Sequence, residues 1–491
     1  MTMKKLVVMT AGVGVVAGVA MAAAGMFQGG QPAVYASRLA GIQGAGATGI
    51  QVQNLDASQP ATVLADFYKQ GPASAAIQVS RPGVPAGGAV NMYLPSVTEL
   101  SNGAYAAIIS ADRQIAAIAR TDWDTSKAAA IYSNVQPGKE VFVPLAVINY
   151  YGQTSLVSIQ NTDTGQVATV TVDLYATGDT TAVVTKAYQV QPGSSVTLDL
   201  AKDSAFVGVK ANTPGGFLGS MKVSSAVDVG VQSFVDIATS QKAVYAFEGV
   251  PPEGAAMKLY APLIRKEQLA GTNAGGAKGF STGLSVVNPT NAPVSVTAKY
   301  YGSSGPCAGN TYTDGPQAIP AGSSYVFYQP ASAALPAGCV GSAVLEADGN
   351  ILAIVNDAKN EGELSAAYNA VPATQGATKV ALPLARRQHT PMKFTTGIQV
   401  MNIGTGPANV EAMFADDKGV GLNTCGGACK VVVQPLNAAT FFPSNSLNAM
   451  PVNSYGSAVI TSDQPIVVIV NDISETSAAD AATYNGIKAD L

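Results

Sequence analysis

The sequence predicts an all-β protein, in which four tandem antiparallel β-sandwich domains follow an N-terminal hydrophobic helix. Three observations lead to this prediction: four internal repeats, short strand-like segments separated by Gly and Pro, and no segment with the period of an amphipathic helix. Gly and Pro account for 51 and 28 of the 491 residues. Seven or so short strands in each repeat favour two antiparallel sheets packed face to face.

The N-terminal segment is expected to direct export. Lys4 and Lys5 precede an uncharged run over residues 6–27, which contains small-residue cleavage sites around Ala22. This is the layout of a secretory signal peptide, and the run is also long enough to span a bilayer if it is retained. Residues 1–30 are therefore interpreted as a signal peptide or a membrane anchor. The rest of the chain is expected to be secreted or displayed on the cell surface, with the membrane contacted only through this segment.

The four repeats share a segment that ends in asparagine. It reads TGIQVQN, SLVSIQN, TGLSVVN and TGIQVMN, and its last residue is Asn54, Asn161, Asn288 and Asn402. These asparagines are 107, 127 and 114 residues apart. Bridges such as LYAPLIR and VALPLAR join the repeats, and the predicted domains cover residues 33–133, 140–248, 257–371 and 378–487. Four such domains in line would form a rod or a bent string of beads.

The strands follow from the spacing of apolar residues. Alternation over residues 170–174 predicts a strand with one solvent-exposed face. The continuous apolar runs Ile351–Val355 and Ile466–Val470 predict strands that are covered on both faces. Asp348 and Gly349 lie between two strand-like runs and predict a hairpin turn, and the same hairpin is expected in every repeat.

Two other residue types recur in each repeat. An aspartate follows the last long strand, and a tyrosine closes the repeat: Asp122, Asp236, Asp357 and Asp472, then Tyr132, Tyr245, Tyr368 and Tyr484. The aspartates are interpreted as Asx turns that end a strand, and the alternative is a Ca²⁺ site at a domain junction. The tyrosines are expected at the edge of the core, with a buried ring and a hydrogen-bonded hydroxyl.

All four cysteines lie in the last two repeats, at Cys307, Cys339, Cys425 and Cys429. An even number in an exported chain predicts disulfides, and pairing within repeats, 307–339 and 425–429, is favoured among three connectivities. A metal site would need more ligands than one CxxxC supplies, and no histidine lies nearby in the sequence. We therefore expect no metal site here and no cofactor, with the calcium site as the alternative.

Composition excludes several classes of function. Only 12% of the residues are charged and the net charge is −4, so the basic clusters that a nucleic-acid partner requires are missing. The chain has one histidine and no GxSxG motif, so we expect no enzyme and assign no catalytic residue.

The combined pattern resembles a known kind of repeat. An aliphatic-Pro-Leu bridge, TGIQVQN, a Pro-Gly-Ser turn, GSAVITSDQP, IVND and YNG together resemble the tandem immunoglobulin-like repeats of exported surface proteins of filamentous bacteria. The resemblance extends over nearly the whole chain after residue 33, although the first repeat reads ARTD instead of IVND. It implies immunoglobulin-like sandwiches and a surface location, and it implies no enzymatic activity.

These observations predict an exported, non-enzymatic structural or adhesive protein of the cell surface. Weakly charged surfaces repel one another less, so self-assembly into a filament or layer, or association with other surface components, belongs to this prediction. One alternative is an extracellular binding module for carbohydrate or a partner protein. Another is an accessory extracytoplasmic subunit of a membrane complex, held by an uncleaved N-terminal helix.

Overall fold

The computed structural model describes residues 46–489 except residues 72, 124–127, 134, 238–242, 273–275, 360–363, 391, 423–428, 443–449 and 476–480. The N-terminal segment 1–30 lies outside the described residues. The described chain is all-β, and its helical residues form short 3-10 turns: η1 (Leu94–Ser96), η2 (Pro252–Gly254), η3 (Gly305–Cys307), η4 (Gln329–Ala331) and η5 (Ala373–Gln375). None of the described helical segments has the length and apolar character needed to cross a membrane.

The strands repeat four times along the chain, and we call these units copies one to four. Copy one contains β1 (Gly46–Asn54), β2 (Ala61–Lys69), β3 (Ile77–Val84), β4 (Ala89–Tyr93), β5 (Tyr105–Ala111), β6 (Ile115–Trp123) and β7 (Ala128–Tyr132). Copy two contains β8 (Gly138–Ile148), β9 (Gln153–Asn161), β10 (Ala168–Ala176), β11 (Ala182–Val190), β12 (Ser195–Asp199), β13 (Phe217–Ile237) and β14 (Ala243–Glu248).

The last two copies repeat the same order and add two short strands. Copy three contains β15 (Ala256–Lys266), β16 (Phe280–Val287), β17 (Val294–Ser304), β18 (Thr311–Ile319), β19 (Ser324–Tyr328), β20 (Cys339–Lys359) and β21 (Leu364–Asn369), and β22 (Val371–Pro372) follows it. Copy four contains β23 (Ala377–Arg387), β24 (Phe394–Asn402), β25 (Ala408–Asp416), β26 (Lys430–Val433), β27 (Ala438–Phe441), β28 (Ser454–Ser474) and β29 (Ala481–Asn485), and β30 (Ile487–Lys488) follows it.

Each copy consists of two antiparallel sheets. The outer sheets have the strand orders β3-β2-β5, β11-β10-β13-β8, β18-β17-β20-β15 and β26-β25-β28-β23. The inner sheets have the orders β4-β1-β6-β7, β12-β9-β13-β14, β19-β16-β20-β21 and β27-β24-β28-β29. The 21-residue strands β13, β20 and β28 therefore belong to both sheets of their copy, and copy one has β5 and β6 in their place.

The predicted hairpin at Asp348 and Gly349 is wrong, because β20 continues through both residues instead of folding back. Before them β20 pairs with β15 and β17; after them it pairs with β16 and β21 and meets β15 at Ile351 alone. The polar dipeptide therefore marks the crossing from the outer to the inner sheet. The Asp348 carboxylate accepts a hydrogen bond from the Ser295 N–H at 2.7 Å, which satisfies the start of an outer strand. Asp112 and Asp463 accept the equivalent bonds in copies one and four.

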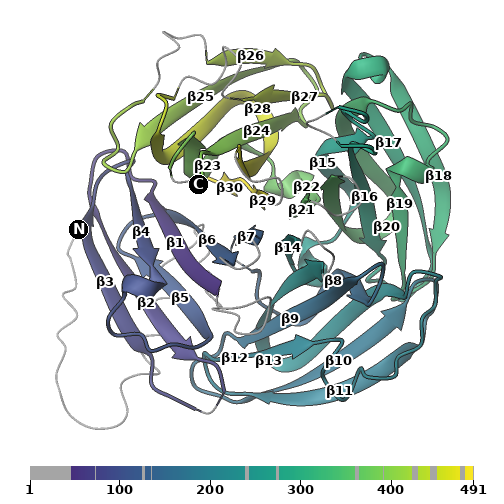
Figure 1. The fold of residues 1–491 in the computed structure, drawn as a ribbon, viewed down its shortest axis with the longest axis horizontal. Helices are drawn as coiled ribbons and strands as arrows, with labels where there is room; N and C mark the ends of the chain where they lie inside the picture. The colour runs from purple at the N-terminus through teal and green to yellow at the C-terminus, as the bar shows by residue number, and fades with distance from the viewer. Residues whose placement is uncertain are drawn as a thin grey trace.

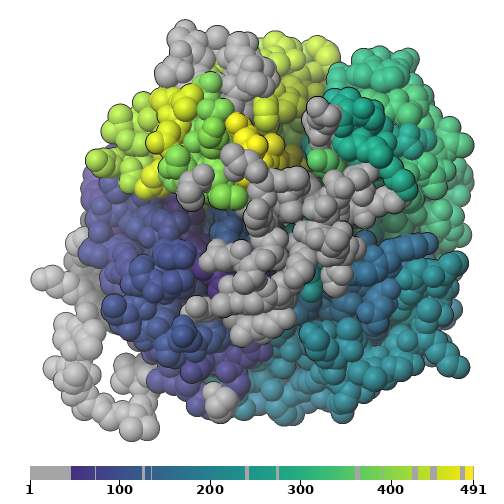
Figure 2. All heavy atoms as spheres, viewed as in Figure 1, coloured from purple at the N-terminus to yellow at the C-terminus, as the bar shows by residue number. Residues whose placement is uncertain are grey.

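The four copies close into a ring (Figure 1), so the predicted rod is wrong. Strands β7, β14, β21 and β29 lie in the middle, where β7 contacts β14, β14 contacts β21, β21 contacts β29, and β29 contacts β7 again. Figure 2 shows copy one, in purple and blue, directly against copy four, in yellow-green. The first and last copies are therefore neighbours in space, although more than two hundred residues separate them in the sequence.

Closure follows from how the hydrophobic cores are completed. The core of copy one includes Phe234 and Val244 of copy two, and the core of copy two includes Ile354 and Ala367 of copy three. Ile469 of copy four lies in the core of copy three. The cycle ends with two side chains of copy one, Ile118 and Ile131, which lie in the core of copy four. Each copy therefore takes part of its core from the next one around the ring.

This arrangement explains the continuous apolar runs found in the sequence. Ile351–Val355 and Ile466–Val470 are buried throughout, as predicted for strands covered on both faces. One face of each run packs within its own copy, and the other face contacts the preceding copy.

The recurrent asparagines hold the loops next to the inner sheets. Asn402 is fully buried, its Nδ2 donates to the carbonyls of Gly406 and Val433 at 2.8 Å, and its Oδ1 accepts from the Gly404 N–H at 2.8 Å. Asn54, Asn161 and Asn288 make the same kinds of bond in their copies. One side chain thus satisfies several backbone groups that the sheets leave unpaired.

We predict that Asn402→Asp destabilises the protein by about 3 kcal/mol, because two carbonyls lose their donor and a carboxylate is buried beside them. Urea unfolding of the oxidised chain measures this. The matched control is Asn310→Asp, since Asn310 is exposed and its amide only reaches the Ala308 carbonyl at 3.3 Å. Equal midpoints for the two variants would contradict the structural role of Asn402.

Candidate functional site

One end of the axis of the ring is built from four residues, each of which follows the last aromatic residue of a central strand. Strand register places Glu248, Asn369 and Asn485 opposite Gln232, Ile354 and Ile469, which are equivalent positions of β13, β20 and β28. Ser133 follows β7 at the corresponding place in copy one. We call Ser133, Glu248, Asn369 and Asn485 the axial quartet.

Hydrogen bonds link the axial quartet from copy to copy. The Asn485 side chain accepts from the Asn369 N–H at 3.0 Å and donates to the Asn369 carbonyl at 2.8 Å. The Asn369 side chain makes the same two bonds to the backbone of Glu248, at 3.2 and 2.7 Å. Glu248 Oε1 accepts from the Ser133 N–H and hydroxyl at 2.7 and 3.0 Å. The side chains of Glu248, Asn369 and Asn485 thus each satisfy backbone groups of the preceding copy.

A cavity of about 400 Å³ opens at this end of the axis, and all four copies line it. Its polar lining includes the axial quartet together with Gln136, Thr374, Gln375 and Lys488. Its apolar lining includes Val250, Val371, Val380, Ile466 and Ile487. A pocket with convergent polar groups and an apolar wall is the usual form of a small-molecule site.

Glu248 carries the negative charge of this cavity. Its side chain is half-buried, and burial raises the pKa of its carboxyl above the ordinary glutamate range, although the hydrogen bonds from Ser133 oppose this shift. The other charged side chain in the lining is Lys488, and no ion pair within the described chain joins it to Glu248. A carboxyl group without a cationic partner in a partly closed cavity is a candidate ligand contact.

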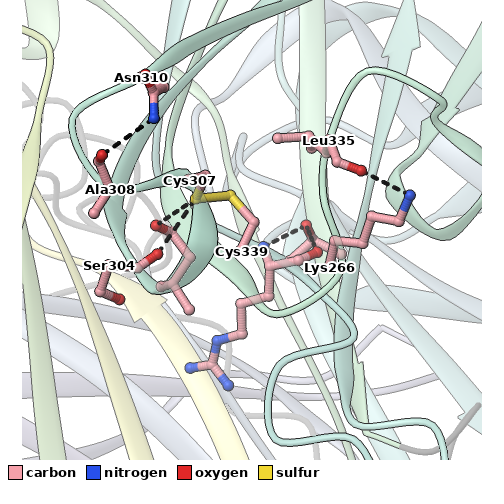
Figure 3. The surroundings of a disulfide bond; sticks show 10 residues. Lys266, Ser304, Cys307, Ala308, Asn310, Leu335 and Cys339 are labelled. Carbon is pink, nitrogen blue, oxygen red and sulfur yellow. Dashed lines mark hydrogen bonds between the residues drawn. A yellow bond between two sulfur atoms is a disulfide. The ribbon is translucent and has the colours of Figure 1, made fainter.

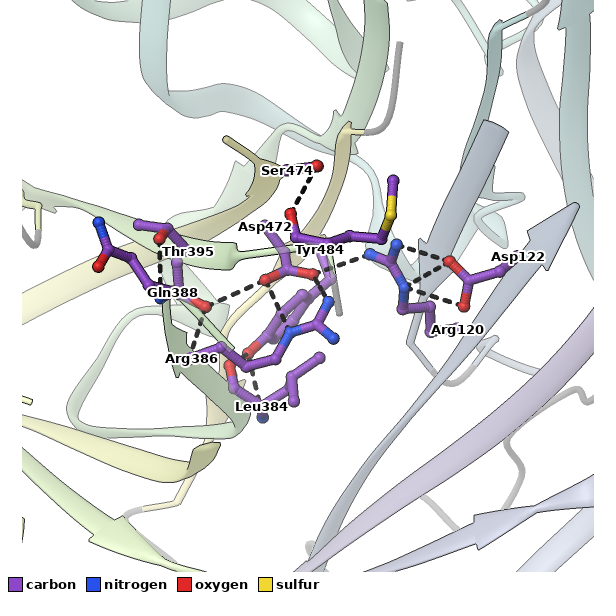
Figure 4. A network of polar contacts seen from close by, with 11 residues as sticks. Arg120, Asp122, Leu384, Arg386, Gln388, Thr395, Asp472, Ser474 and Tyr484 are labelled. Carbon is purple, nitrogen blue, oxygen red and sulfur yellow. Dashed lines mark hydrogen bonds and ion pairs between the residues drawn. The ribbon is translucent and has the colours of Figure 1, made fainter. Parts of the chain in front are cut away.

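A second polar cluster closes the ring between copies one and four (Figure 4). Asp472 is fully buried, and Arg120 of copy one contacts it with Nη1 at 2.8 Å from Oδ2. Arg386 binds both oxygens of the same carboxylate, and Thr396 donates to Oδ1 at 3.2 Å. The guanidinium groups of Arg120 and Arg386 lie 4.4 and 4.0 Å from the ring centre of Phe394. The cluster is saturated by its own partners, which indicates a structural role.

The residues at the positions of Arg386 and Asp472 differ between copies, and these differences also indicate a structural role for the cluster. Copy three repeats the pair as Arg265 and Asp357, 3.4 Å apart, with Arg265 over Phe280. Copy two has buried Val147 and Val235 instead. The backbone contact is kept, because the N–H groups of Arg386, Arg265 and Val147 all donate to a hydroxyl at about 3.0 Å. Replacing a buried ion pair by apolar residues preserves the fold.

The recurrent aspartates do not share one structural position. Asp357 and Asp472 lie opposite Thr282 and Thr396, whereas Thr121 lies opposite Thr48 and Val235 opposite Ser155. Asp122 and Asp236 are one residue further along their strands and so face the other way. The single recurrent Asx turn predicted for all four is therefore wrong. A calcium ion is disfavoured at these positions, because Asp357 is paired with one arginine and Asp472 with two. The described residues also contain no group of three or more His, Cys, Asp or Glu side chains placed to hold a metal ion.

The closing tyrosines are buried and hydrogen-bonded. Tyr368 and Tyr484 donate to the carbonyls of Leu263 and Leu384, the leucines of the Pro-Leu bridges. The Tyr132 hydroxyl lies 3.4 Å from the Thr121 hydroxyl. In copy two the equivalent residue is Phe247 rather than Tyr245, because Phe247 pairs with Ser233 where Tyr484 pairs with Val470. Tyr245 lies two residues earlier on the same face and donates to Gln153.

Cys307 and Cys339 form the predicted disulfide in copy three (Figure 3). Both are fully buried, and the bond ties the turn η3 to the start of β20. Cys429 is also disulfide-bonded, and Cys425 lies outside the described residues. Trp123 is fully buried in the core of copy one.

Sequence reasoning missed the axial quartet and the importance of Arg120. The signal for the quartet is the residue that follows the closing aromatic residue, in the pairs Tyr-Ser, Phe-Glu, Tyr-Asn and Tyr-Asn. Two of these pairs belong to the YNG and YNA endings, whose asparagine bonds only become visible once the neighbouring copies are in place.

Comparison with known proteins leaves the family open. No protein family model matches the chain, and no curated protein matches it. Among solved structures, the Anabaena sensory rhodopsin transducer is 21% identical over 19% of this chain and 92% of its own, with a TM-score of 0.15. An anti-sigma factor domain-containing protein is 8% identical over 87% of this chain and 98% of its own, with a TM-score of 0.12. At these TM-scores neither similarity bears on the ring or on its function.

We predict that Arg120→Met lowers stability by about 1–3 kcal/mol, because the buried Asp472 loses a charged partner and copies one and four lose a contact. The control is Arg113→Met, since the side chain of Arg113 is 39% exposed and lies 3.6 Å from Asp56 of its own copy. Surface pairs of this kind contribute little. The midpoint of urea unfolding reports both variants, and a shift for Arg120→Met no larger than for Arg113→Met would refute its role in ring closure.

We also predict that Glu248→Gln stabilises the protein near neutral pH and that this gain disappears at low pH. Because burial raises the pKa of Glu248 in the folded state, the folded protein holds a proton that the unfolded chain has lost. Wild-type stability therefore falls as the pH rises from the unfolded to the folded pKa, whereas glutamine has no charge to bury. Unfolding midpoints of both proteins across this range measure the difference. A constant difference at every pH would contradict the shifted pKa.

Proposed function

We propose that this chain is an exported, non-enzymatic protein of the cell surface, built from immunoglobulin-like copies, that acts by binding as a single rigid ring. The observation that carries the proposal is that every copy takes core side chains from its neighbour, and copy four takes them from copy one. Such a body has little freedom to rearrange, which suits a protein that presents fixed surfaces to a ligand or a partner.

The proposed location is supported by a disulfide in copy three and by the composition of the N-terminal segment. The disulfide between Cys307 and Cys339 is typical of oxidising, extracytoplasmic compartments. The signal-like layout of residues 1–30 favours export of the same chain.

Ring closure favours adhesion or ligand binding over assembly into a filament. The contact between successive copies is heterologous, since one face of a copy contacts a different face of the next. Interfaces of this kind form open fibres when they do not close and rings when they do. Here the last copy meets the first, so the faces that could extend a fibre are already used. Carbohydrate and partner proteins remain the candidate ligands of the surface.

The proposal is tested on intact cells. Gold-labelled antibody against the ring should decorate the cell surface, and the purified protein should show separate compact particles in negative-stain electron microscopy. An internal cytoplasmic protein of the same cells serves as the labelling control. A chain that is found only in the cytosol with all four cysteines alkylated by a thiol reagent would refute the export, and filaments of purified protein would refute the single ring.

A further inference from the structure

We propose that the axial cavity binds a ligand with a protonated primary amine on a short aliphatic chain, and that Glu248 is the residue that contacts the amine. The inference rests on the proposed binding function and assigns a ligand class to it. It starts from the comparison of four equivalent positions around one axis: Ser133, Glu248, Asn369 and Asn485.

The ring itself does not require a glutamate at residue 248. Asn485 and Asn369 each make two hydrogen bonds to the backbone of the preceding copy, because an amide can both accept and donate. An ionised Glu248 can only accept, and it satisfies the Ser133 N–H and hydroxyl but donates nothing to the Ser133 carbonyl. An amide would therefore serve the ring better than the carboxylate that is present. A residue that departs from its equivalents in the other copies, without making better hydrogen bonds, is a candidate for function.

The geometry leaves half of the carboxylate for a ligand. Both bonds from Ser133 fall on Oε1. No hydrogen bond from another described residue to Oε2 accompanies these two, and Glu248 lines the cavity. Lys488 is the other charged residue of the described lining, but it is exposed and forms no ion pair with Glu248, and the remaining described lining residues are uncharged. An ammonium group on Oε2 would supply both the missing donor and the missing positive charge.

The rest of the lining suits an aliphatic amine. Val250, Val371 and Ile487 offer apolar contacts for a short methylene chain, and the cavity of about 400 Å³ lies at the lower end of the range for small-molecule sites. A divalent cation fits less well, since Ca²⁺ takes six to eight oxygen ligands and Glu248 is the one carboxylate in the described lining. The same ammonium chemistry is offered by a free diamine and by the lysine side chain of a peptide.

Isothermal titration calorimetry of the full chain near neutral pH tests the proposal with three probes. 1,5-Diaminopentane stands for the free amine, N-acetyl-lysine methylamide stands for the peptide lysine, and 1-pentanol is the uncharged counterpart. We expect at least one amine to bind, with 1-pentanol weaker by about tenfold or more. The stronger of the two amines identifies the source. Failure of both amines to bind, or equal binding of 1-pentanol, overturns the proposal.

Three variants distinguish amine binding in the cavity from general electrostatic attraction to the protein. Glu248→Gln keeps an acceptor for Ser133 and removes the charge, so amine binding should weaken by about tenfold or more. Glu253→Gln is the matched control, since it removes the same charge from an exposed residue outside the cavity lining, and binding should be unchanged. Thr374→Trp, at an exposed position of the lining, should hinder entry and weaken binding while Glu248 itself is left unchanged.

Equal affinity of the wild type and both cavity variants overturns the assignment, as does an equal loss in Glu253→Gln. The outcome is independent of the surface-labelling experiment. A chain that binds no amine can still be a surface adhesin, and a cytosolic chain can still bind an amine, so the two failures are distinguishable.

Discussion

The apolar second face of each inner sheet has to be covered by another copy, and this need determines how the four copies are arranged. Ile354, Ile469 and Ile118 lie at equivalent positions of successive inner strands, and each is buried in the core of the preceding copy. A linear array would leave the Ile118 face of copy one without a cover and the core of copy four incomplete. Ring closure removes both defects with one contact, in the same way as terminal caps protect the ends of open repeat proteins. The buried bonds of Asp472 then fix the contact between the first and last copies.

The same closure creates the polar end of the axis. Four central strands meet there, and side chains of the next copy satisfy the N–H groups of Ser133, Glu248 and Asn369 and the carbonyls of Glu248 and Asn369. Side-chain amides at Asn369 and Asn485 mimic a backbone group and bond to the neighbouring copy in both directions. The axis therefore requires polar residues for structural reasons, and polarity alone does not identify a binding site. What distinguishes Glu248 is that it solves the same structural problem less well than its neighbours do and adds a charge.

The sequence was sufficient to predict the all-β class, the fourfold repeat and the disulfide between Cys307 and Cys339. It was also sufficient to predict that Ile351–Val355 and Ile466–Val470 are buried on both faces, but periodicity does not say what covers the second face. The hairpin prediction failed because Asp348 and Gly349 suit a sheet crossing as well as a reversal. The alignment of Asp122 with Asp472 failed because a shift of one residue, invisible in the sequence, reverses the face of a strand. Arg120 and Glu248 act across copies, and such contacts have no local signal.

Four copies in one chain allow equivalent positions to carry different residues, which a ring of four identical subunits does not. In copies two, three and four, the position of Asp472 is occupied by Val235, Asp357 and Asp472, and the partner residue changes with it, from Val147 to Arg265 and Arg386. Because the two residues change together, neither an arginine nor an aspartate is buried without its partner, and this is a structural reason for the change. Glu248 changes without a compensating cation among the described residues. In a symmetric tetramer the same glutamate would place four like charges around one axis, which would strongly disfavour their ionisation. A single chain can place one carboxylate there, and one is what recognition of a single ammonium group needs.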